Sequence, residues 1–412
     1  MAADVAAMPR TGEEKTPGYA WVILIVVFLA SFTVPVNFFK VPTIAPVLIE
    51  QFNMGDNFGW MMSMFTFISI LLSFPAAGLA KKFGMRIVTI VSISAAIAGG
   101  LIGVFAVNMP MLLFGRFLEG LCMGFFGVIA PAMITQWFPR KTVGLAAGIW
   151  SIWMPAGGAV MSAVVPIIFG ATNSWQVVWW VAIFYSAIAL VLFLVFYRVP
   201  PDMTKEALAN RSDEEREAAK GGFKRAMSLS IIFIGIAFVI YNLCNNGTVN
   251  TYLPLYLQDK SIDMQTAGLI AALQLALAIV ANALGGFVSD RLGTRKWPMV
   301  FGFAALMVGT WMIFDFGGSV PLLLGGVLIA GLFPGAVSAC ATAAIPELIP
   351  NKEDQGYGMA MLGFGAGVGS FIGGLALGWL NPVFGSWEMA AHVLLVPLIL
   401  IGIVATLFVK VR

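Results

Sequence analysis

Two cations and one carboxylate lie inside long apolar segments of this chain, and they are the first candidates for chemistry. Lys40 falls in the first apolar segment, while Arg116 and Glu119 fall in the fourth, three residues apart and therefore on one helix face. Charges in such segments face a partner or a wet cavity, because an apolar environment penalises them. We expect Lys40 and Arg116 to bind a small anion through charge-assisted hydrogen bonds, while Glu119 gains and loses a proton.

The linkage between these groups would couple two binding events. Protonation of Glu119 would raise the positive charge of the site and hence its affinity for an anion, so proton symport could arise. A structural role is the alternative for each residue. Arg116 and Glu119 could simply neutralise one another, and Lys40 could extend its ammonium toward the outer headgroups.

A second polar group surrounds Gly247 in the seventh apolar segment. Its substrate-binding candidates are Tyr241, Asn242, Asn245 and Asn246, and Thr248 and Asn250 follow. Lipid does not accept so many amides, so this stretch is predicted to unwind or to line water. Asn37 of the first segment would face the matching region, whereas hydrogen bonding between helices is the alternative reading.

Two aromatic residues are weaker candidates for the wall of the site. Trp150 and Trp153 precede Pro155, which lacks a backbone N–H and permits a bend. Packing in the core explains them equally well. The lone histidine, His392, is expected to pack, and exposure at the interface is expected to explain Asp315.

The sequence contains no pattern typical of catalysis. It has no nucleotide-binding G-x-x-x-x-G-K-[ST], no His-rich metal spacing and no Ser/His/Asp trio in its polar loops. Its three cysteines lie far apart inside apolar segments, and its net charge of +3 is spread over many loops. We therefore predict no enzyme, no cofactor, no metal and no nucleic-acid partner, and expect ion or solute gradients to supply the energy.

The elements that position these residues are membrane-spanning helices. The chain is 60% hydrophobic and 10% charged, with a mean hydropathy of +0.93, whereas soluble chains carry roughly 25% charged residues. Segments of about twenty apolar residues suit helices that cross a bilayer, and no strand-like alternation is present. The predicted class is an all-α membrane protein with twelve transmembrane helices near 19–48, 58–80, 86–107, 110–137, 142–169, 175–197, 227–257, 265–289, 297–316, 320–345, 356–380 and 387–409.

The basic residues predict the orientation. Of the 23 Lys and Arg residues, all but Lys40, Arg116 and Lys260 fall in the tails or in loops that follow even-numbered helices. The positive-inside rule places those loops and both termini in the cytoplasm. No apolar run precedes the charges of the N-terminus, so no cleavable signal peptide is expected, and a bacterial inner membrane is the predicted location.

The chain reads as two related halves. We predict a cytoplasmic tail at 1–18, a six-helix bundle at 19–198, a charged cytoplasmic linker at 199–226, a second bundle at 227–409 and a short tail at 410–412. Three features recur at a shift of about 210 residues, as internal duplication would leave them. They are Asn37 and Pro46 against Asn245 and Pro254, Gly120 and Gly124 against Gly331 and Gly335, and Gly84 and Arg86 against Gly293 and Arg295.

The loop after the eighth helix carries the residues that relate this chain to a known family. Gly286, Asp290, Arg291, Gly293 and Arg295 fit G-x-x-x-D-R-x-G-x-R, and Arg116 and Gly120 fit R-x-x-x-G. Over residues 19–409 the chain resembles the major facilitator superfamily. The resemblance implies two pseudo-symmetric six-helix bundles, a central cavity lined by helices 1, 4, 7 and 10, and a loop motif that locks the cytoplasmic gate. The first-half copy of the motif has Lys81 in place of Asp and is expected to lack that lock.

A looser likeness concerns residues 144–158 and 175–180, GLAAGIWSIWMPAGG and WQVVWW. They are similar to cyanate-permease-like members and distantly to nitrate and nitrite porters. The arginines that nitrate porters carry in helices 2 and 8 are missing here.

These features favour a secondary carrier that works by alternating access, as a monomer in the lipid bilayer. Its predicted substrate is a small organic or inorganic anion, moved by proton coupling or by anion exchange. Efflux of drugs or lipophilic cations is one alternative, which the cations at Lys40 and Arg116 oppose. A membrane sensor that does not transport is the other.

Overall fold

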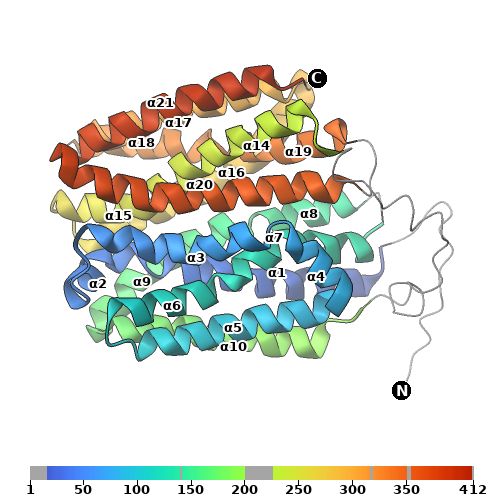
Figure 1. The fold of residues 1–412 in the computed structure, drawn as a ribbon, viewed down its shortest axis with the longest axis horizontal. Helices are drawn as coiled ribbons and strands as arrows, with labels where there is room; N and C mark the ends of the chain where they lie inside the picture. The colour runs from blue at the N-terminus through green and yellow to red at the C-terminus, as the bar shows by residue number, and fades with distance from the viewer. Residues whose placement is uncertain (1–15, 140–141, 200–225, 316–318, 350–353, 411–412) are drawn as a thin grey trace.

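The computed structural model describes residues 16–139, 142–199, 226–315, 319–349 and 354–410, and within them every regular element is a helix. The helices run roughly side by side along the long axis of the molecule (Figure 1). Most of the predicted N-terminal tail (1–15), nearly all of the predicted linker (200–225) and the end of the C-terminal tail (411–412) lie outside the described residues.

The first half contains six spans. They are built from α1 (Gly18–Phe39), η1 (Pro42–Ile44) and α2 (Ala45–Gln51); then, after η2 (Gly55–Phe58), from α3 (Gly59–Leu72) and α4 (Pro75–Phe83); α5 (Met85–Val104); α6 (Met109–Glu119) and α7 (Leu121–Trp137); α8 (Val143–Ser151) and α9 (Trp153–Thr172); and α10 (Trp175–Phe196).

The second half repeats this arrangement. Its six spans are α14 (Leu229–Asn242), the π-helix η4 (Leu243–Val249) and α15 (Asn250–Asp259); α16 (Met264–Leu292); α17 (Lys296–Asp315); α18 (Val320–Leu332) and α19 (Gly335–Leu348); α20 (Gln355–Phe384); and α21 (Trp387–Phe408).

Eleven helical stretches of the described residues are long and apolar enough to cross a membrane. The remaining span is the second, predicted as one helix over 58–80. It is divided into α3 and α4, because Pro75 cannot continue the hydrogen-bonded ladder and instead begins the new helix. The chain is therefore an all-α membrane protein with twelve spans.

Close glycine contacts repeat between the halves. A Cβ added at Gly120 would lie 2.0 Å from Phe65 O, and one at Gly331 would lie 2.8 Å from Gln274 O, so in each half the fourth span touches the second. The third and fourth spans repeat a second contact. A Cβ at Gly115 would lie 2.7 Å from Gly99 O, and one at Gly326 would lie 2.9 Å from Gly309 O. The internal duplication indicated by the sequence therefore extends to the helix contacts, which recur between equivalent spans of the two halves.

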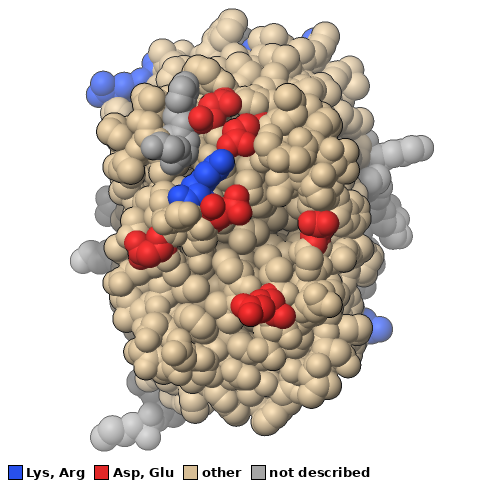
Figure 2. Space-filling view, turned by 90° about the vertical axis from the view of Figure 1, so that its left-hand side faces the viewer, with Lys and Arg blue, Asp and Glu red and all other residues tan. Residues whose placement is uncertain are grey.

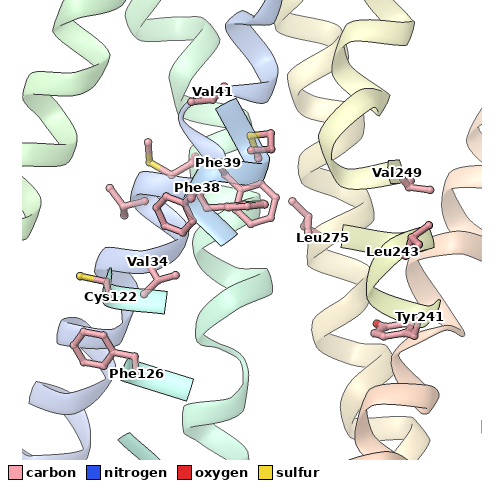
Figure 3. Packing of buried hydrophobic residues seen from close by; sticks show 14 of the residues in the cluster. Val34, Phe38, Phe39, Val41, Cys122, Phe126, Tyr241, Leu243, Val249 and Leu275 are labelled. Atoms are coloured by element: carbon pink, nitrogen blue, oxygen red, sulfur yellow. The ribbon is translucent and has the colours of Figure 1, made fainter. Parts of the chain in front are cut away.

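The halves meet where α9 packs on α16 and α3 packs on α20. Among the described residues, hydrogen bonds cross this boundary from Gln258 Nε2 to Thr43 O at 3.0 Å and from Ser63 Oγ to Phe371 O at 2.7 Å. Phe39 and Leu275 meet beside Gly158, and Figure 3 shows their side chains next to each other. Apolar contacts therefore join the two bundles at this level.

The end of the molecule that holds α2 and α15 is acidic. Glu50, Asp56, Asp259 and Asp263 are exposed there. Figure 2 shows this face, on which acidic side chains outnumber basic ones.

Candidate functional site: a buried ion triad in the first half

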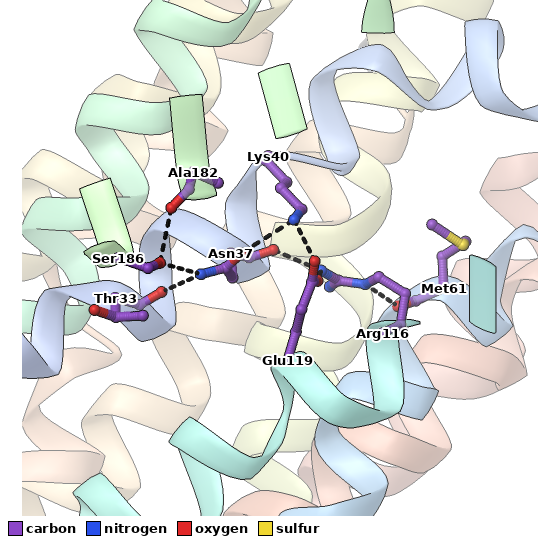
Figure 4. A network of polar contacts seen from close by, with 8 residues as sticks. All are labelled: Thr33, Asn37, Lys40, Met61, Arg116, Glu119, Ala182 and Ser186. Carbon is purple, nitrogen blue, oxygen red and sulfur yellow. Dashed lines mark hydrogen bonds and ion pairs between the residues drawn. The ribbon is translucent and has the colours of Figure 1, made fainter. Parts of the chain in front are cut away.

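The first-half candidates form one connected ion network. Glu119, the last residue of α6, accepts a bond from Lys40 Nζ on Oε1 at 2.5 Å and a bond from Arg116 Nη1 on Oε2 at 2.6 Å. Lys40 follows directly after α1, and all three side chains are 0% exposed. We call Lys40, Arg116 and Glu119 the triad (Figure 4).

Backbone and amide groups hold the triad in place. Asn37 Oδ1 accepts from Lys40 Nζ at 3.0 Å, while its Nδ2 donates to Thr33 O at 2.9 Å and to Ser186 Oγ at 3.3 Å. The Arg116 guanidinium donates to Met61 O at 3.0 Å and to Asn37 O at 2.6 Å. The network thereby joins spans 1, 2, 4 and 6.

The triad has an excess of positive charge, because one carboxylate serves two cations. Two aromatic faces offset part of this excess: Lys40 Nζ lies 4.4 Å from the ring centre of Trp179, and Arg116 Cζ lies 4.6 Å from that of Phe65. Within the described part of the chain, Arg116 Nη2 has no hydrogen-bond partner although it is buried. Such an arrangement favours an anionic or hydrogen-bond-accepting partner.

The structure brings Lys40 together with the Arg116 and Glu119 pair, but inside the first half. The triad does not line an opening between the halves, since each of its side chains is fully enclosed. Phe39, the neighbour of Lys40, makes the contact with the second half. Lys40 also does not extend to the headgroups, because Glu119 and Asn37 bind its ammonium at depth.

Two members of this network gave no signal in the sequence. Trp179 and Ser186 of α10 contact the network although their span carries no charge and no dense polar pattern. Ser186 Oγ itself donates to Ala182 O, four residues earlier in the same helix.

The amide-rich stretch of span 7 remains helical instead of unwinding. It widens into the π-helix η4, a form that is frequent at functional sites. Asn242, Asn246 and Asn250 form a ladder, with Asn246 Nδ2 to Asn242 Oδ1 at 2.7 Å and Asn250 Nδ2 to Asn246 Oδ1 at 2.8 Å. On another side of the helix Asn245 Nδ2 donates to the hydroxyl of Tyr241 at 3.4 Å.

Gly247 at the centre of η4 is required by packing. A Cβ there would lie 2.8 Å from Gly373 Cα and 2.9 Å from Ser370 O, both in α20. The backbones of spans 7 and 11 therefore touch at this point, and any larger residue would separate them.

The tryptophan candidates lie against the first span. Trp150 and Trp153 are half-buried and stack with ring centres 5.5 Å apart, on either side of the junction between α8 and α9. Trp150 Nε1 donates to Ser31 Oγ at 2.9 Å. The pair thus braces α8 and α9 against α1.

The loop motif forms a charged cluster at the opposite end from the acidic face. Gly293 ends α16 with a φ of +63°, which glycine adopts without strain. Arg295 pairs with Asp290 and with Glu347 of α19, the second at 2.8 Å, and also binds Ser289 Oγ at 2.9 Å. Burial alone would lower the pKa of Arg295, but its bonds to Asp290 and Glu347 raise it.

These motif contacts stay within the second half. A cavity of about 510 Å³ lies beside them, lined by Ser289, Asp290, Gly293, Arg295, Glu347, Leu348 and Lys410. Gly286 has open space beside it, and Arg291 is exposed and lies over Phe287. In this conformation the motif therefore ties α16 to α19.

Comparison with known proteins decides the family. The Major Facilitator Superfamily model matches residues 27–262 and 239–412. The chain belongs to the Major Facilitator Superfamily.

Relatives within this superfamily match most of the chain. It is 25% identical over 418 residues to the "Probable sulfoacetate transporter SauU" of Cupriavidus necator, covering 94% of this chain and 93% of that protein. It is 22% identical to the "Hexuronate transporter" of Bacillus subtilis, with 84% of each covered, and 23% identical to the "Nitrate/nitrite transporter NrtP" of Picosynechococcus, with 77% of each covered.

A solved structure agrees with the fold of this superfamily. The crystal structure of a D-xylose-proton symporter superposes with a TM-score of 0.77 at 15% sequence identity, covering 96% of this chain and 98% of that one. The predicted all-α, multi-pass membrane fold is confirmed.

One contact near the acidic end was not predicted from the sequence. His392 Nε2 lies 2.9 Å from Asp315 Oδ2, joining the start of α21 to the end of α17. His392 was expected only to pack, and Asp315 only to be exposed at the interface. Both side chains are partly exposed, so the pair lies near the surface of the protein and not in its core.

Proposed function

We propose that this protein is a secondary active transporter that moves a small organic or inorganic anion by alternating access. The observation that carries the proposal is the triad, in which two buried cations share one carboxylate. Removing charges from water is costly, and here the cost is not fully offset inside the protein. An anionic passenger would supply the missing negative charge.

The names of the relatives support an anion as the substrate. Sulfoacetate, hexuronate, nitrate and 4-hydroxybenzoate are the substrates in the names of proteins that match this chain. All are anions at neutral pH, although they differ in size and in hydrogen-bonding groups. Their shared feature is the charge that Lys40 and Arg116 would bind.

Glu119 provides a route to coupling. While ionised, its two oxygens occupy Lys40 and Arg116; once protonated, it competes poorly for either cation. A proton and an anion would therefore bind together, and exchange of anions would follow if one anion displaces another without the proton. Access to the enclosed triad requires spans 1, 2, 4 and 6 around it to rearrange during the transport cycle.

The remaining candidates take supporting roles in this proposal. Tyr241, Asn242, Asn245 and Asn246 contribute polar groups from the second half, Asn37 positions Lys40, and Trp150 and Trp153 brace α8 and α9. The motif from Gly286 to Arg295 holds the cytoplasmic end of the second half. The transporter would act as a monomer, with both termini in the cytoplasm of a bacterial cell and two bundles, 19–198 and 227–409, as its moving parts.

Uptake into proteoliposomes tests this function. The purified chain is assayed with labelled sulfoacetate, a hexuronate and nitrate, with and without an inward proton gradient. We expect uptake of at least one anion, and its loss in Lys40→Gln and Arg116→Gln. Lys260→Gln is the matched control, because Lys260 is a partly exposed lysine that pairs with Glu388 at 2.8 Å.

Three outcomes would count against the proposal. Unchanged uptake in both triad variants removes the triad from the binding site. Transport of lipophilic cations instead of anions indicates an efflux carrier. A protein that binds anions but moves none of them across the membrane acts as a sensor.

A further inference from the structure

Arg86 is an exposed arginine at the start of α5, and it pairs with no carboxylate among the residues that the structure describes. Its Nη2 donates to Leu194 O at 3.2 Å, in the last turn of α10. A guanidinium carries several N–H donors and no acceptor. One carbonyl bond therefore leaves most of its donors available for an anion.

A second arginine lies at the same end of α10. Arg198, two residues beyond this helix, stands over the ring of Tyr19 with Cζ 5.3 Å from the ring centre. The Tyr19 hydroxyl donates to Phe196 O at 2.5 Å, which fixes the ring beside the last residue of α10. Arg198 also has no carboxylate partner within the described part of the chain. Two guanidiniums thus lie at the carboxyl end of this helix without a counter-ion there.

The internal duplication supplies a comparison within the same chain. The shift of about 210 residues that relates the two halves also relates the charged positions at this end of the molecule. The aligned pairs are Arg86 with Arg295, Arg198 with Lys410, Lys81 with Asp290, and Gln136 with Glu347.

In the second half these charges balance. Arg295 pairs with both Asp290 and Glu347. Lys410 lines the same cavity as these three residues. Two cations therefore share two carboxylates, and the protein itself neutralises this group.

In the first half the carboxylates are missing. The aligned positions hold three cations, Arg86, Arg198 and Lys81, and the neutral Gln136. Gln136 Nε2 lies 3.6 Å from Met85 Sδ, so the position of Glu347 is again next to the start of the following helix but brings no charge. The first half keeps the cations and lacks the anions that would balance them.

The surroundings of Arg86 are apolar and face outward. The neighbouring residues Ile87, Leu194, Val195 and Phe196 are between 41 and 61% exposed. Their helices, α5 and α10, lie on the side of the first half that is away from the second half (Figure 1). In a membrane protein such apolar surface faces acyl chains, and a basic residue at its end lies at the level of the headgroups.

We propose that Arg86 binds the phosphate of an anionic membrane lipid such as phosphatidylglycerol, with Arg198 adding to the attraction. The phosphate takes the place of the carboxylates that neutralise Arg295 in the second half. A planar guanidinium suits a phosphate, and the exposed apolar residues beside it suit the acyl chains that a soluble anion lacks. This site is separate from the triad and does not depend on which solute is transported.

Lipid titration of the purified full-length chain in a neutral detergent tests the site. Native mass spectrometry measures the binding of phosphatidylglycerol, of phosphatidylcholine with the same acyl chains, and of glycerol 3-phosphate. We expect phosphatidylglycerol to bind most tightly. Arg86→Gln is expected to weaken its binding about fivefold and to leave phosphatidylcholine unaffected, whereas Arg86→Lys should keep most of the affinity.

Two further variants assign the effect to the charge balance. Arg291→Gln is the matched control, because Arg291 is an exposed arginine at the same end of the molecule, with Cζ 4.6 Å from the ring centre of Phe287. It should keep the native affinity. Gln136→Glu restores the carboxylate that Glu347 supplies in the second half, and it should weaken the binding of phosphatidylglycerol while Arg86 is left in place.

Four results would overturn the lipid site. They are equal affinity of the native chain for the two lipids, undiminished binding of phosphatidylglycerol in Arg86→Gln, an equal loss in Arg291→Gln, and binding of glycerol 3-phosphate as tight as that of the lipid. The last of these would indicate a soluble anion as the occupant. Thermal midpoints of the variants verify that each is folded, and Gln136→Glu tests the site without removing the arginine.

Discussion

Lys40 Nζ and Glu119 Oε1 lie 2.5 Å apart although 79 residues separate them in the chain. Both side chains are fully enclosed by the first half. Because Arg116 pairs with the same carboxylate, the contact is part of a three-residue ion network and not an isolated ion pair. The consequences of removing each member therefore differ.

Removing the carboxylate is expected to be far more harmful to stability than removing the lysine. Glu119→Gln leaves two buried cations without a counter-ion, and breaking a buried pair in this way costs about 3–5 kcal/mol. Lys40→Met leaves Arg116 and Glu119 as a neutral pair and should change the thermal midpoint little, although it abolishes uptake. Thermal unfolding in detergent and proteoliposome uptake measure the two effects.

The double variant provides the control for this comparison. Lys40→Met with Glu119→Gln restores the single excess charge of the native triad, so it should recover part of the stability lost in Glu119→Gln. If Lys40→Met destabilises as strongly as Glu119→Gln, charge balance does not govern this site.

Gly120→Ala is expected to destabilise the first half. The added methyl would lie 2.0 Å from Phe65 O, a backbone atom that cannot turn away, and overpacking of this kind costs roughly 1–3 kcal/mol. Gly127→Ala in the same span is the control, because open space surrounds that position. We expect a lower unfolding temperature for the first variant only. Equal midpoints would contradict the helix contact.

Arg295→Gln should slow uptake without a large change in stability. The pairs with Asp290 and Glu347 are partly exposed, and such pairs contribute about 0–1 kcal/mol. Their loss frees α16 from α19 at the end opposite the acidic face, and in the proposed alternating-access cycle this alters the balance between conformations. Initial uptake rates and thermal midpoints are to be compared with those of Lys296→Gln. A large fall in midpoint with normal uptake would assign Arg295 a structural role instead.

The cap of α16 should show a defined dependence on pH. Hydrogen bonds from Thr266, including its backbone N–H at 3.0 Å, hold the pKa of Asp263 below its ordinary value of 3.8. A depressed pKa means that the ionised cap stabilises the fold above the unfolded pKa and loses this effect as pH falls through the folded value. The difference in midpoint between the native chain and Asp263→Ala should therefore be constant near neutrality and shrink below about pH 4. A difference that grows on acidification would refute this sign.

Much of the architecture followed from composition and spacing. Long apolar segments predicted the twelve spans, and the paired glycines indicated an internal duplication whose helix contacts recur in both halves. The break at Pro75 was not predicted, since a proline can also begin or bend a helix within one span. The stretch around Gly247 was predicted to unwind or to line water. The π-helix was not predicted, because a cluster of amides does not distinguish a π-helix from an unwound segment.

The site could be predicted only from charged residues that lie inside apolar segments, and therefore at membrane depth. Lys40, Arg116 and Glu119 were expected to meet, since charges within apolar segments need partners. The direction of their side chains was not accessible, because a one-residue rotation about α1 decides whether Lys40 or Phe39 faces the other half. Trp179 was missed for a similar reason: a tryptophan in an apolar helix gives no sign that a cation lies on its ring.

Span 11 carries glycine on two sides. Gly365, Gly369 and Gly373 lie against span 7, and Gly367 and Gly374 lie against α3. Glycine has no side chain that interdigitates with a neighbouring helix. One helix backbone can therefore tilt against another with few changes of side-chain rotamer. α20 can therefore shift against span 7 of its own half and against α3 of the first half with little rearrangement of side chains. Under the proposed alternating-access cycle, a bulky residue on either of these faces would hinder that movement without contacting the triad.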